Sequence, residues 1–564
     1  MQTRQFGVLY RHFLLRFIDL EAFPAHGATN KMLGRIAALL LFIGTWLSLG
    51  ALGIANGRNG RRVTLTSAWP FEHLMIATTM LAAGLLAVLS WDSLLPDRRD
   101  VLALAPLPVR DRTWSAAKIA AAGTALAASI AAVNLCTSLA LPLALAPDSS
   151  SVVELILSPE LYRAFAAYWI TVLAAGALVF GAVLALQGLA AQFLARRLFL
   201  RASALLQIAA FFSFVGIYFL QPWHASLKAL AAPELRAQVD WLPSYWFLAL
   251  FQQLNGAVEP VIAPLATRAE MALAIVGTAA ALAYAVSYCR TLRKIVEEPD
   301  ILVRSRESSL PPFGDSLSTA IVQFSIRSFL RSRQHRLILA FYLGTGFAIA
   351  VCLSKTVFAD GGALVFSSWI IMCAAVVGMR AGFGLPLSLR ANWVFRITEV
   401  RSPRVYFRAI RRPLFALAVW PVWLVFTAMI LLVWPSRPAV MHAAVLALWG
   451  LLLGHLSLNK CRKIPFTCSY APGKTPIHMA FLAALALIYT VGLTVRFEMA
   501  ALNRPGAYAK LLVSAAIAAL AARWRTVTPD SLEQASVLFE DAPEPPVLSL
   551  GLHGDHTLLP GRFS

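Results

Sequence analysis

The chain has 564 residues, of which 59% are hydrophobic and only 14% are charged, and its net charge is +21. A soluble domain has about 25% charged residues, so this composition excludes an ordinary soluble protein. The apolar residues come in blocks of about 20, the length that crosses the hydrocarbon core of a membrane. The sequence therefore predicts an all-α, polytopic transmembrane helical bundle. The basic residues sit mainly in alternate loops, so we expect no nucleic-acid partner.

About twelve segments are long and apolar enough to span a membrane. Three segments between them are rich in Lys and Arg, and all three fall on one side when the spans are counted. That side is the cytoplasm, so we expect a multi-pass protein of the bacterial cell (inner) membrane with both termini inside. The basic segment 56–62, "NGRNGRR", falls outside by the same count, which leaves a miscounted early helix open. The predicted spans are 34–55, 70–91, 116–145, 164–191, 200–221, 268–289, 337–356, 362–386, 413–434, 439–457, 477–495 and 508–523, and the basic segments are 290–336, 387–412 and 458–475.

The longest predicted outer loop, 222–267, contains the sequence "DWLPSYWFLALFQQLNG". Its aromatic residues Trp241, Tyr245 and Trp246 are typical of the headgroup level of a membrane. We expect an amphipathic helix that lies at the membrane surface. A cap over a transport path is the alternative interpretation.

An amphipathic basic segment precedes a span in each half of the chain, at 5–20 and at 321–336. Such helices lie in the inner interface of a membrane, with their arginines toward lipid phosphates. The residues that share an apolar face are Phe6, Leu9, Phe13, Phe17 and Leu20 in the first segment and Val322, Ile326, Phe329 and Leu330 in the second. The predicted anchors are Arg11, Arg16, Arg327 and Arg331.

A charged inner loop follows the second span of each predicted half. The loops are 96–112, "PDRRDVLALAPLPVRDR", and 389–413, and they share the order basic residue, short apolar run, proline, basic residue. With the amphipathic segments, they predict a weak six-plus-six repeat whose halves are 1–315 and 316–527. The acidic residues 528–564 are typical of an unstructured cytoplasmic tail. Basic inner loops are common to polytopic proteins, so an origin without duplication stays open.

The sequence lacks the motifs of catalysis and cofactor binding. The stretch "CSYAPGKT" at 468–475 ends like a phosphate-binding loop, but Cys468 stands where the first glycine belongs. No CxxC and no metal-binding spacing of histidines occurs. We therefore expect no enzymatic activity, no cofactor and no catalytic residue in this chain. Glu72 and Glu270 sit near span ends, so coupling to an ion gradient through side chains is poorly supported.

Three stretches resemble the ABC-2-type exporter permeases, which are the membrane subunits of ATP-driven transporters. They are "FGVLYRHFLLRF", "SIRSFLRSRQHRLILAFYLGTG" and "LLPDRRDVLALAPLPVRDRTWSAAK". In that family an interfacial helix precedes the first span, and a short cytoplasmic coupling element between the second and third spans meets a separate ATPase. The resemblance covers the architecture of both halves, and this chain looks like two six-span units fused. It implies an exporter of an unknown substrate that works with a separate ATPase subunit.

The resemblance also implies that the two charged inner loops contact the ATPase. Charged rims set the register and the rate of association, and the apolar run "VLALAPL" would supply a buried centre. A loop that its arginines hold at the lipid surface is the alternative. The residues implied to contact the ATPase are Asp97, Arg98, Arg99, Asp100, Arg110, Arg112, Arg390, Arg396, Arg401 and Arg404.

Three other functions stay open for a helical protein of this kind. A secondary transporter of the major-facilitator type has the same number of spans. However, "LLPDRRDVLAL" lacks the glycine of that family's loop, and the expected absence of buried carboxylates also counts against it. A membrane-embedded enzyme predicts a titratable cluster at one interface. A non-transporting integral membrane subunit is the third.

Overall fold

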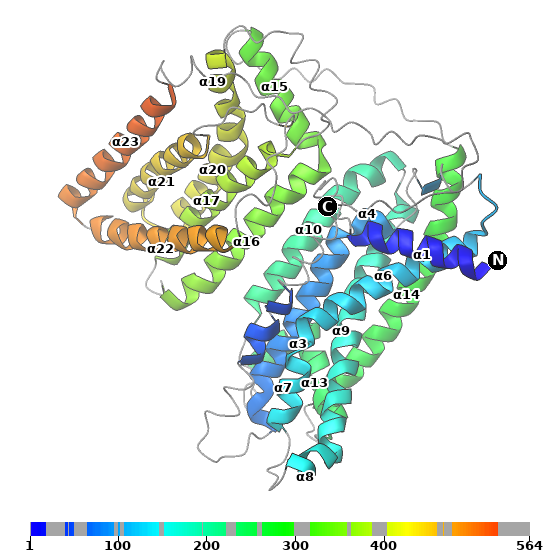
Figure 1. Cartoon of the computed structure of the whole chain (residues 1–564). Coiled ribbons are helices and arrows are strands. Elements are labelled where there is room, and N and C mark those ends of the chain that lie inside the picture. Colours follow the sequence, from blue (N-terminus) through cyan, green and yellow to red (C-terminus); the bar gives the residue numbers. More distant parts are fainter. Residues whose placement is uncertain are drawn as a thin grey trace, which may run out of the picture. The chain divides into compact units, whose positions relative to one another are not determined.

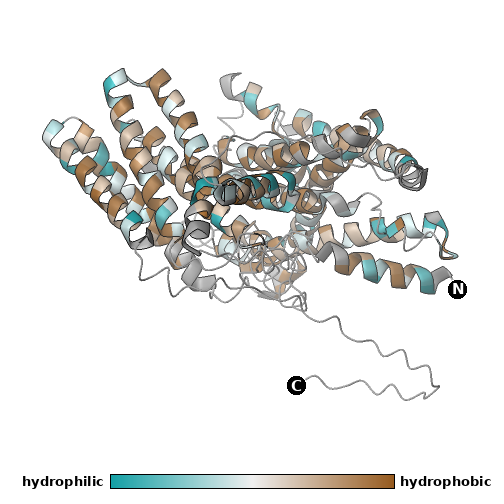
Figure 2. Cartoon of the chain, turned by 90° about the horizontal axis from the view of Figure 1, so that it is seen from above, coloured by the Kyte–Doolittle hydropathy of each residue, from teal (hydrophilic) through white to brown (hydrophobic). Residues whose placement is uncertain are grey.

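The computed structural model of the chain is all-α in the residues that it describes, and no strand occurs among them (Figure 1). The helices are brown, and therefore hydrophobic, over much of their length in Figure 2. The described residues are 2–18, 40–42, 44–49, 65–94, 100–101, 106–145, 152–194, 196–221, 233–256, 262–297, 316–357, 362–385, 403–458, 466, 477–502 and 504–527. The predicted acidic tail 528–564 and the basic segment 56–62 lie outside them.

Ten helices of the described part are long and apolar enough to cross a membrane. Two shorter apolar helices, Leu40–Leu49 and Leu205–Leu220, coincide with the predicted spans 34–55 and 200–221. Each of the other predicted spans overlaps one of the ten, which confirms the all-α polytopic architecture. The ten are Ala68–Leu89, Arg112–Asn134, Pro159–Phe193, Ala263–Ser287, Gln334–Ser354, Ala363–Phe383, Ala409–Val433, Ser436–Ser457, Ala484–Leu502 and Pro505–Trp524.

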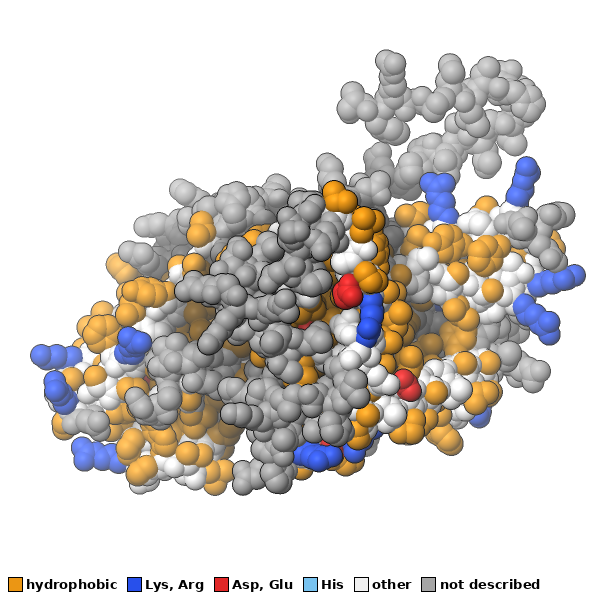
Figure 3. Space-filling model, turned by 90° about the horizontal axis from the view of Figure 1, so that it is seen from below, with side chains coloured by type: hydrophobic (Ala, Val, Ile, Leu, Met, Phe, Trp, Pro, Cys, Tyr) orange, Lys and Arg blue, Asp and Glu red, His pale blue; other side chains and the backbone are white. Residues whose placement is uncertain are grey.

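Large apolar side chains lie on the outside of these helices. Leu432 is 87% exposed and Ile275 is 66% exposed. On the face drawn in Figure 3, hydrophobic side chains cover most of the coloured surface. A surface of this kind is stable against lipid and unfavourable in water, so the chain is an integral, multi-pass membrane protein.

The contacts between residues divide the chain into two compact units. Unit 1 comprises 1–309, 333–378 and 494–499, and unit 2 comprises 310–332, 379–493 and 500–564. Residues 333–378 belong to unit 1 because α16 packs on α10. The predicted halves, with their boundary between 315 and 316, therefore differ from the two contact units, and the duplication stays a prediction.

Unit 1 is built around the long helix α9, which packs against α3, α13 and α14. Gly188 allows a close approach of α9 to α14, because a Cβ atom on it would lie 2.8 Å from the Cβ atom of Ala283. The helices are α1 (Gln2–Ile18), α3 (Leu65–Leu89), α4 (Trp91–Leu94), α6 (Asp111–Asn134), α7 (Thr137–Leu145), α8 (Val152–Leu157), α9 (Pro159–Phe193), α10 (Arg196–Leu220), α12 (Pro233–Val239), α13 (Pro243–Leu254), α14 (Ile262–Glu297), α16 (Arg333–Val357) and the larger part of α17 (Ala363–Phe383).

Unit 2 contains one long helical path that changes pitch between two prolines. Pro413 and Pro421 have no N–H, and the wide π-helical turn Phe415–Val419 lies between them. The ring of Phe415 packs against Gly454, where any Cβ atom would overlap it. The helices are α15 (Ser316–Arg331), α19 (Pro403–Leu414), the turn, α20 (Trp420–Val433), α21 (Ser436–Ser457), most of α22 (Ile477–Leu502) and α23 (Pro505–Val527).

The two amphipathic segments form helices whose apolar faces are covered by protein. In unit 1, α1 packs on α6, and Leu9 and Phe13 are buried. In unit 2, α15 packs on α19, and Val322 and Phe329 are buried. The amphipathic helix is thus packed on α6, which follows the charged loop, in unit 1, and on α19, which forms the last part of the charged loop, in unit 2.

Candidate functional site

The charged loop 96–112 is fastened to the bundle by a buried ion pair. The Nζ atom of Lys118 on α6 lies 3.4 Å from Oδ2 of Asp100, and both side chains are less than 5% exposed. The same Nζ atom lies 5.5 Å from the centre of the Phe13 ring on α1. We call these three residues the loop clamp. Asp100, which the resemblance implies to contact the ATPase, is buried and paired in this structure, so it is not part of the exposed surface of the loop.

The exposed part of the loop extends into the first turn of α6. Leu107 is 50% exposed, and both Arg110 and Arg112 are exposed. Val101, from the same apolar run, is buried beside Trp114 in the core around α1 and α6. The loop therefore offers an apolar tip with two arginines next to it. Asp97, Arg98 and Arg99 lie outside the described residues.

The second charged loop is described only from residue 403 onward. Arg404 lies in α19, and its side chain is not described. Arg411, later in α19, is buried, whereas Arg412 is exposed. Arg390, Arg396 and Arg401 lie outside the described part of the chain.

The predicted lipid anchors differ in exposure. Arg11 and Arg331 are exposed, and Arg327 is half-buried. Arg16 lies in α1 and its side chain is not described. Arg327 and Arg331 line an open groove of about 700 Å³ along α15, together with Gln323, Phe324 and Ser328.

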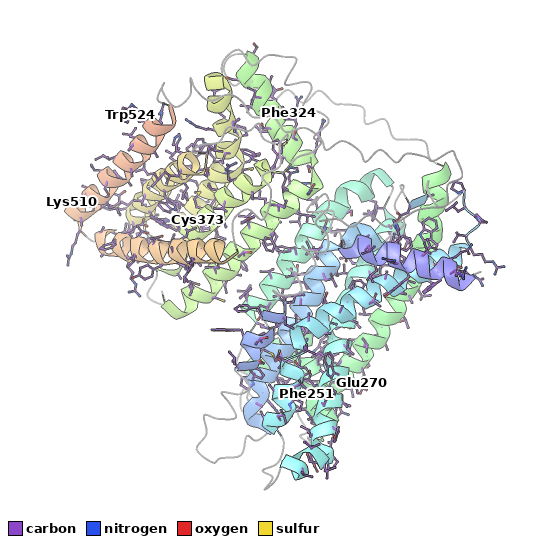
Figure 4. All side chains as sticks on the ribbon, in the orientation of Figure 1. Phe251, Glu270, Phe324, Cys373, Lys510 and Trp524 are labelled. Atoms are coloured by element: carbon purple, nitrogen blue, oxygen red, sulfur yellow. The ribbon has the colours of Figure 1, made fainter. Side chains whose placement is uncertain are left out.

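The predicted surface helix of the outer loop is wrong. Helix α13 is buried among α3, α9 and α14, and Tyr245, Phe247 and Phe251 are no more than 1% exposed. In Figure 4, Phe251 lies among the helices of unit 1. Only Trp241, which precedes the helix, is exposed as expected, at 83%.

Polar contacts hold both ends of α13 in this position. Before it, the guanidinium of Arg268 on α14 lies 2.9 Å from the carboxylate of Asp240, and the indole N–H of Trp246 donates to the Asp240 carbonyl at 2.9 Å. After it, Nε of Arg163 on α9 donates to the Leu254 carbonyl at 2.8 Å. Gly256 has a φ of +88° and leaves the space that the Arg163 guanidinium occupies. The helix is therefore an integral part of the bundle.

Between α3 and α13 lies a polar cluster that the sequence did not predict. His73 Nε2 is 3.0 Å from the Ser244 hydroxyl, which donates to Oε1 of Gln221 at 2.9 Å. The His73 ring stacks on the Tyr245 ring with 4.0 Å between their centres. Burial raises the pKa of the Tyr245 hydroxyl to about 12, so this phenol stays neutral. We call these residues, with Glu72 and Gln252, the α3–α13 cluster.

Glu72 and Gln252 form the deepest contact of the cluster. The side-chain amide of Gln252 donates to Oε2 of Glu72, and each residue is 1% exposed. No Lys or Arg of the described residues pairs with Glu72. A carboxyl in this position within a membrane-spanning helix is a functional feature more often than a packing one, because burying it is costly.

A narrow space, too small to hold a water molecule, lies beside Glu72. It is enclosed by residues from four helices: Glu72, Ile76, Leu141, Tyr168, Thr171, Val172 and Phe251. Three oxygens at or next to it have no hydrogen-bond partner among the described residues, and they belong to Glu72 (Oε1), Thr171 (Oγ1) and Gln252 (Oε1). Orphaned polar atoms of this kind are rare in a folded protein and mark a site that needs an explanation.

Asn134 joins three helices next to the cluster. Its side-chain amide donates to the Thr79 hydroxyl on α3 at 2.9 Å, and its Oδ1 accepts the Tyr168 hydroxyl of α9 at 2.5 Å. The predicted span 116–145 breaks here into α6 and α7. Further along α9, the side-chain amide of Gln187 donates to the Trp91 carbonyl at 2.6 Å.

The expected absence of buried carboxylates is also wrong. Glu498 on α22 is fully buried and accepts the indole N–H of Trp369 at 2.9 Å. Glu72 lies only four residues into its span, but α13 covers it. Mean hydropathy does not reveal either carboxyl, because each lies in a strongly apolar helix whose other residues dominate the mean.

Comparison with known proteins yields no match to a family model, to a curated protein or to a solved structure. Among the described residues, no group of His, Cys, Asp and Glu is arranged to hold a metal ion.

Proposed function

We propose that this integral membrane protein is the permease subunit of an ATP-driven exporter of the ABC-2 type, in which a separate subunit binds and hydrolyses ATP. The observation that carries the proposal is the loop clamp. A loop that receives force from a partner has to be rigidly connected to the helices that move. Lys118 connects the loop to α6 through Asp100, and to α1 through Phe13.

The exposed end of the loop supports a docking role. Leu107 provides an apolar contact at the tip, and Arg110 and Arg112 provide charges beside it. Apolar contacts at the centre of an interface supply most of its affinity, and charges at the rim supply orientation. In this proposal the ATPase pushes on the tip, and the loop clamp passes the displacement to α1 and α6 together.

An ion-coupled carrier is the second candidate, and the buried carboxyls of Glu72 and Glu498 favour it. Such a carrier takes its energy from the membrane gradient. Transport would then continue without ATP and stop when a protonophore collapses the proton gradient. The ATP-driven exporter shows the opposite pattern.

Purification of the full chain from its native membranes tests the proposal. We expect an ATPase subunit to co-purify with the wild type. Charge reversal at the loop, Arg110→Glu with Arg112→Glu, should reduce its recovery at least several-fold, and more strongly at low salt. A matched charge reversal, Arg437→Glu with Arg504→Glu in unit 2, should leave recovery unchanged. If no ATPase accompanies the wild type, or both double variants retain it equally, the proposal is wrong.

A further inference from the structure

We infer that Glu72 is a proton-binding site, and that its proton completes a carboxylic acid–carboxamide pair with Gln252 which joins α3 to α13. The inference does not rest on the exporter proposal, because it concerns contacts inside unit 1 alone. It starts from the orphaned oxygens around the carboxyl.

An ionised Glu72 would leave too many acceptors in this space. A carboxylate is acceptor-only, and the one donor that reaches it is the Gln252 amide. The second carboxylate oxygen and the amide oxygen of Gln252 would then both lack a donor. The space beside them is too narrow for a water molecule, so solvent cannot supply the missing hydrogens.

One proton satisfies both atoms. A protonated carboxyl donates through its O–H and accepts through its carbonyl oxygen. The Gln252 amide offers the complementary pair, with its N–H already directed at Glu72. The acid O–H can therefore donate to Gln252 Oε1 while the amide N–H donates to Glu72 Oε2. If the Gln252 side-chain amide were rotated by 180°, its oxygen would face a carboxyl oxygen of Glu72. A proton would still be required between these two oxygens.

The other groups around Glu72 do not replace this proton. On α3 itself, His73 is directed to Ser244. On α9, the Tyr168 hydroxyl donates to Asn134. On α13, Tyr245 stacks on His73. The charged residues at the ends of α13 are engaged elsewhere, Arg268 with Asp240 and Arg163 with the Leu254 carbonyl.

The proton has a structural consequence for α13. With Glu72 protonated, two hydrogen bonds tie the last turn of α13 to α3. Removal of the proton leaves a buried charge with one donor, and burial of a charge without a counter-ion is strongly unfavourable. Proton release would therefore weaken the packing of α13 on α3, so this packing depends on pH.

Infrared difference spectroscopy of the full chain in lipid nanodiscs tests the site at neutral pH. The wild-type spectrum should contain a carboxylic acid C=O band that shifts in deuterated buffer. This band should be absent from the spectrum of Glu72→Gln. The control Glu160→Gln, at an exposed position in the first turn of α9, should show loss of carboxylate bands only. If Glu72→Gln also loses only carboxylate bands, Glu72 is ionised and the inference is wrong.

A second variant tests the pair without removing the carboxyl. Gln252→Met keeps the length of the side chain but cannot accept the acid O–H strongly, so the acid C=O band of Glu72 should move to higher frequency. An unmoved band would overturn the pairing. This variant also keeps the inference testable if Glu72→Gln fails to fold. The acid C=O band reports on Glu72 and not on His73, because the histidine side chain has no C=O group.

Hydrogen exchange then tests the link to α13. After correction for the intrinsic pH dependence of exchange, the amides of 243–254 in the wild type should lose protection as the pH is raised. Those of Glu72→Gln should keep it, because a Gln–Gln pair retains both hydrogen bonds without a proton. Equal pH dependence in the two proteins would show that the proton does not hold α13.

Discussion

Lys118 reaches Asp100 across 3.4 Å in a place where both side chains are almost completely buried. The pair joins α6 to a loop that the sequence suggests is exposed and charged. Its position against Phe13 adds α1 to the same connection. Lys118 therefore contacts the loop and the amphipathic helix from the spanning helix α6 of unit 1.

Removal of the Lys118 charge should destabilise the protein strongly. Lys118→Met removes the ammonium group that pairs with the buried Asp100 carboxylate, and breaking a buried pair by removing one partner costs about 3–5 kcal/mol. Thermal unfolding of the detergent-solubilised protein measures the loss. The double variant Asp100→Asn with Lys118→Met should recover most of it, since both charges of the buried pair are then removed. If the double variant is as unstable as the single one, the buried charge is not the cause.

A methyl group at Gly188 should separate α9 from α14. The Cβ atom of Gly188→Ala would lie 3.0 Å from the backbone carbonyl carbon of Ala283, which a side-chain movement cannot relieve. Overpacking of this kind costs about 1–3 kcal/mol. Gly123→Ala is the matched control, because a Cβ atom there meets nothing within 4 Å. The control should leave stability unchanged or raise it by up to about 1 kcal/mol, since alanine favours helix.

Asn134 should contribute more to stability than a single hydrogen bond. Asn134→Ala removes the contacts to Thr79 and Tyr168 and leaves the buried Tyr168 hydroxyl without its acceptor, so we expect a loss of about 2–3 kcal/mol. Tyr168→Phe removes one of these bonds and should cost about 1 kcal/mol. Denaturant titration in mixed micelles compares the two. Equal losses would mean that Asn134 does not act as the centre of the network.

The end of α13 should loosen when Arg163 is shortened. Arg163→Met removes the donor to the Leu254 carbonyl, and because the arginine is exposed, global stability should fall by less than about 1 kcal/mol. Hydrogen exchange of 251–256 should nevertheless rise. Arg268→Met, at the other end, should affect 240–246 instead. Faster exchange over the whole helix in both variants would contradict two independent attachments.

The sequence alone predicts the helices well where long apolar runs decide the structure. Each predicted span overlaps an apolar helix, because backbone hydrogen bonds have to be satisfied within a segment that crosses lipid. The amphipathic faces at Leu9 and Phe13, and at Val322 and Phe329, are also predicted correctly as faces. The sequence does not predict what these faces pack against, because a helix face that packs on another helix and one that lies against lipid require the same apolar residues.

Helix α13 shows why composition can mislead. Trp and Tyr favour both a membrane interface and a protein core with hydrogen-bond partners. The sequence around Tyr245 cannot distinguish the two. The choice depends on Asp240 with Arg268 and on Leu254 with Arg163, which lie 28 and 91 positions apart in the chain.

The sequence by itself determined that this chain is an all-α, multi-pass membrane protein, because hydropathy and helix length are local properties. Only the tertiary structure decided that Glu72 is a buried carboxyl facing Gln252, 180 positions away. The environment of a carboxyl is set by every helix that packs around it. The same tertiary contacts place Asp100 inside the bundle, because Lys118 reaches it there and water does not.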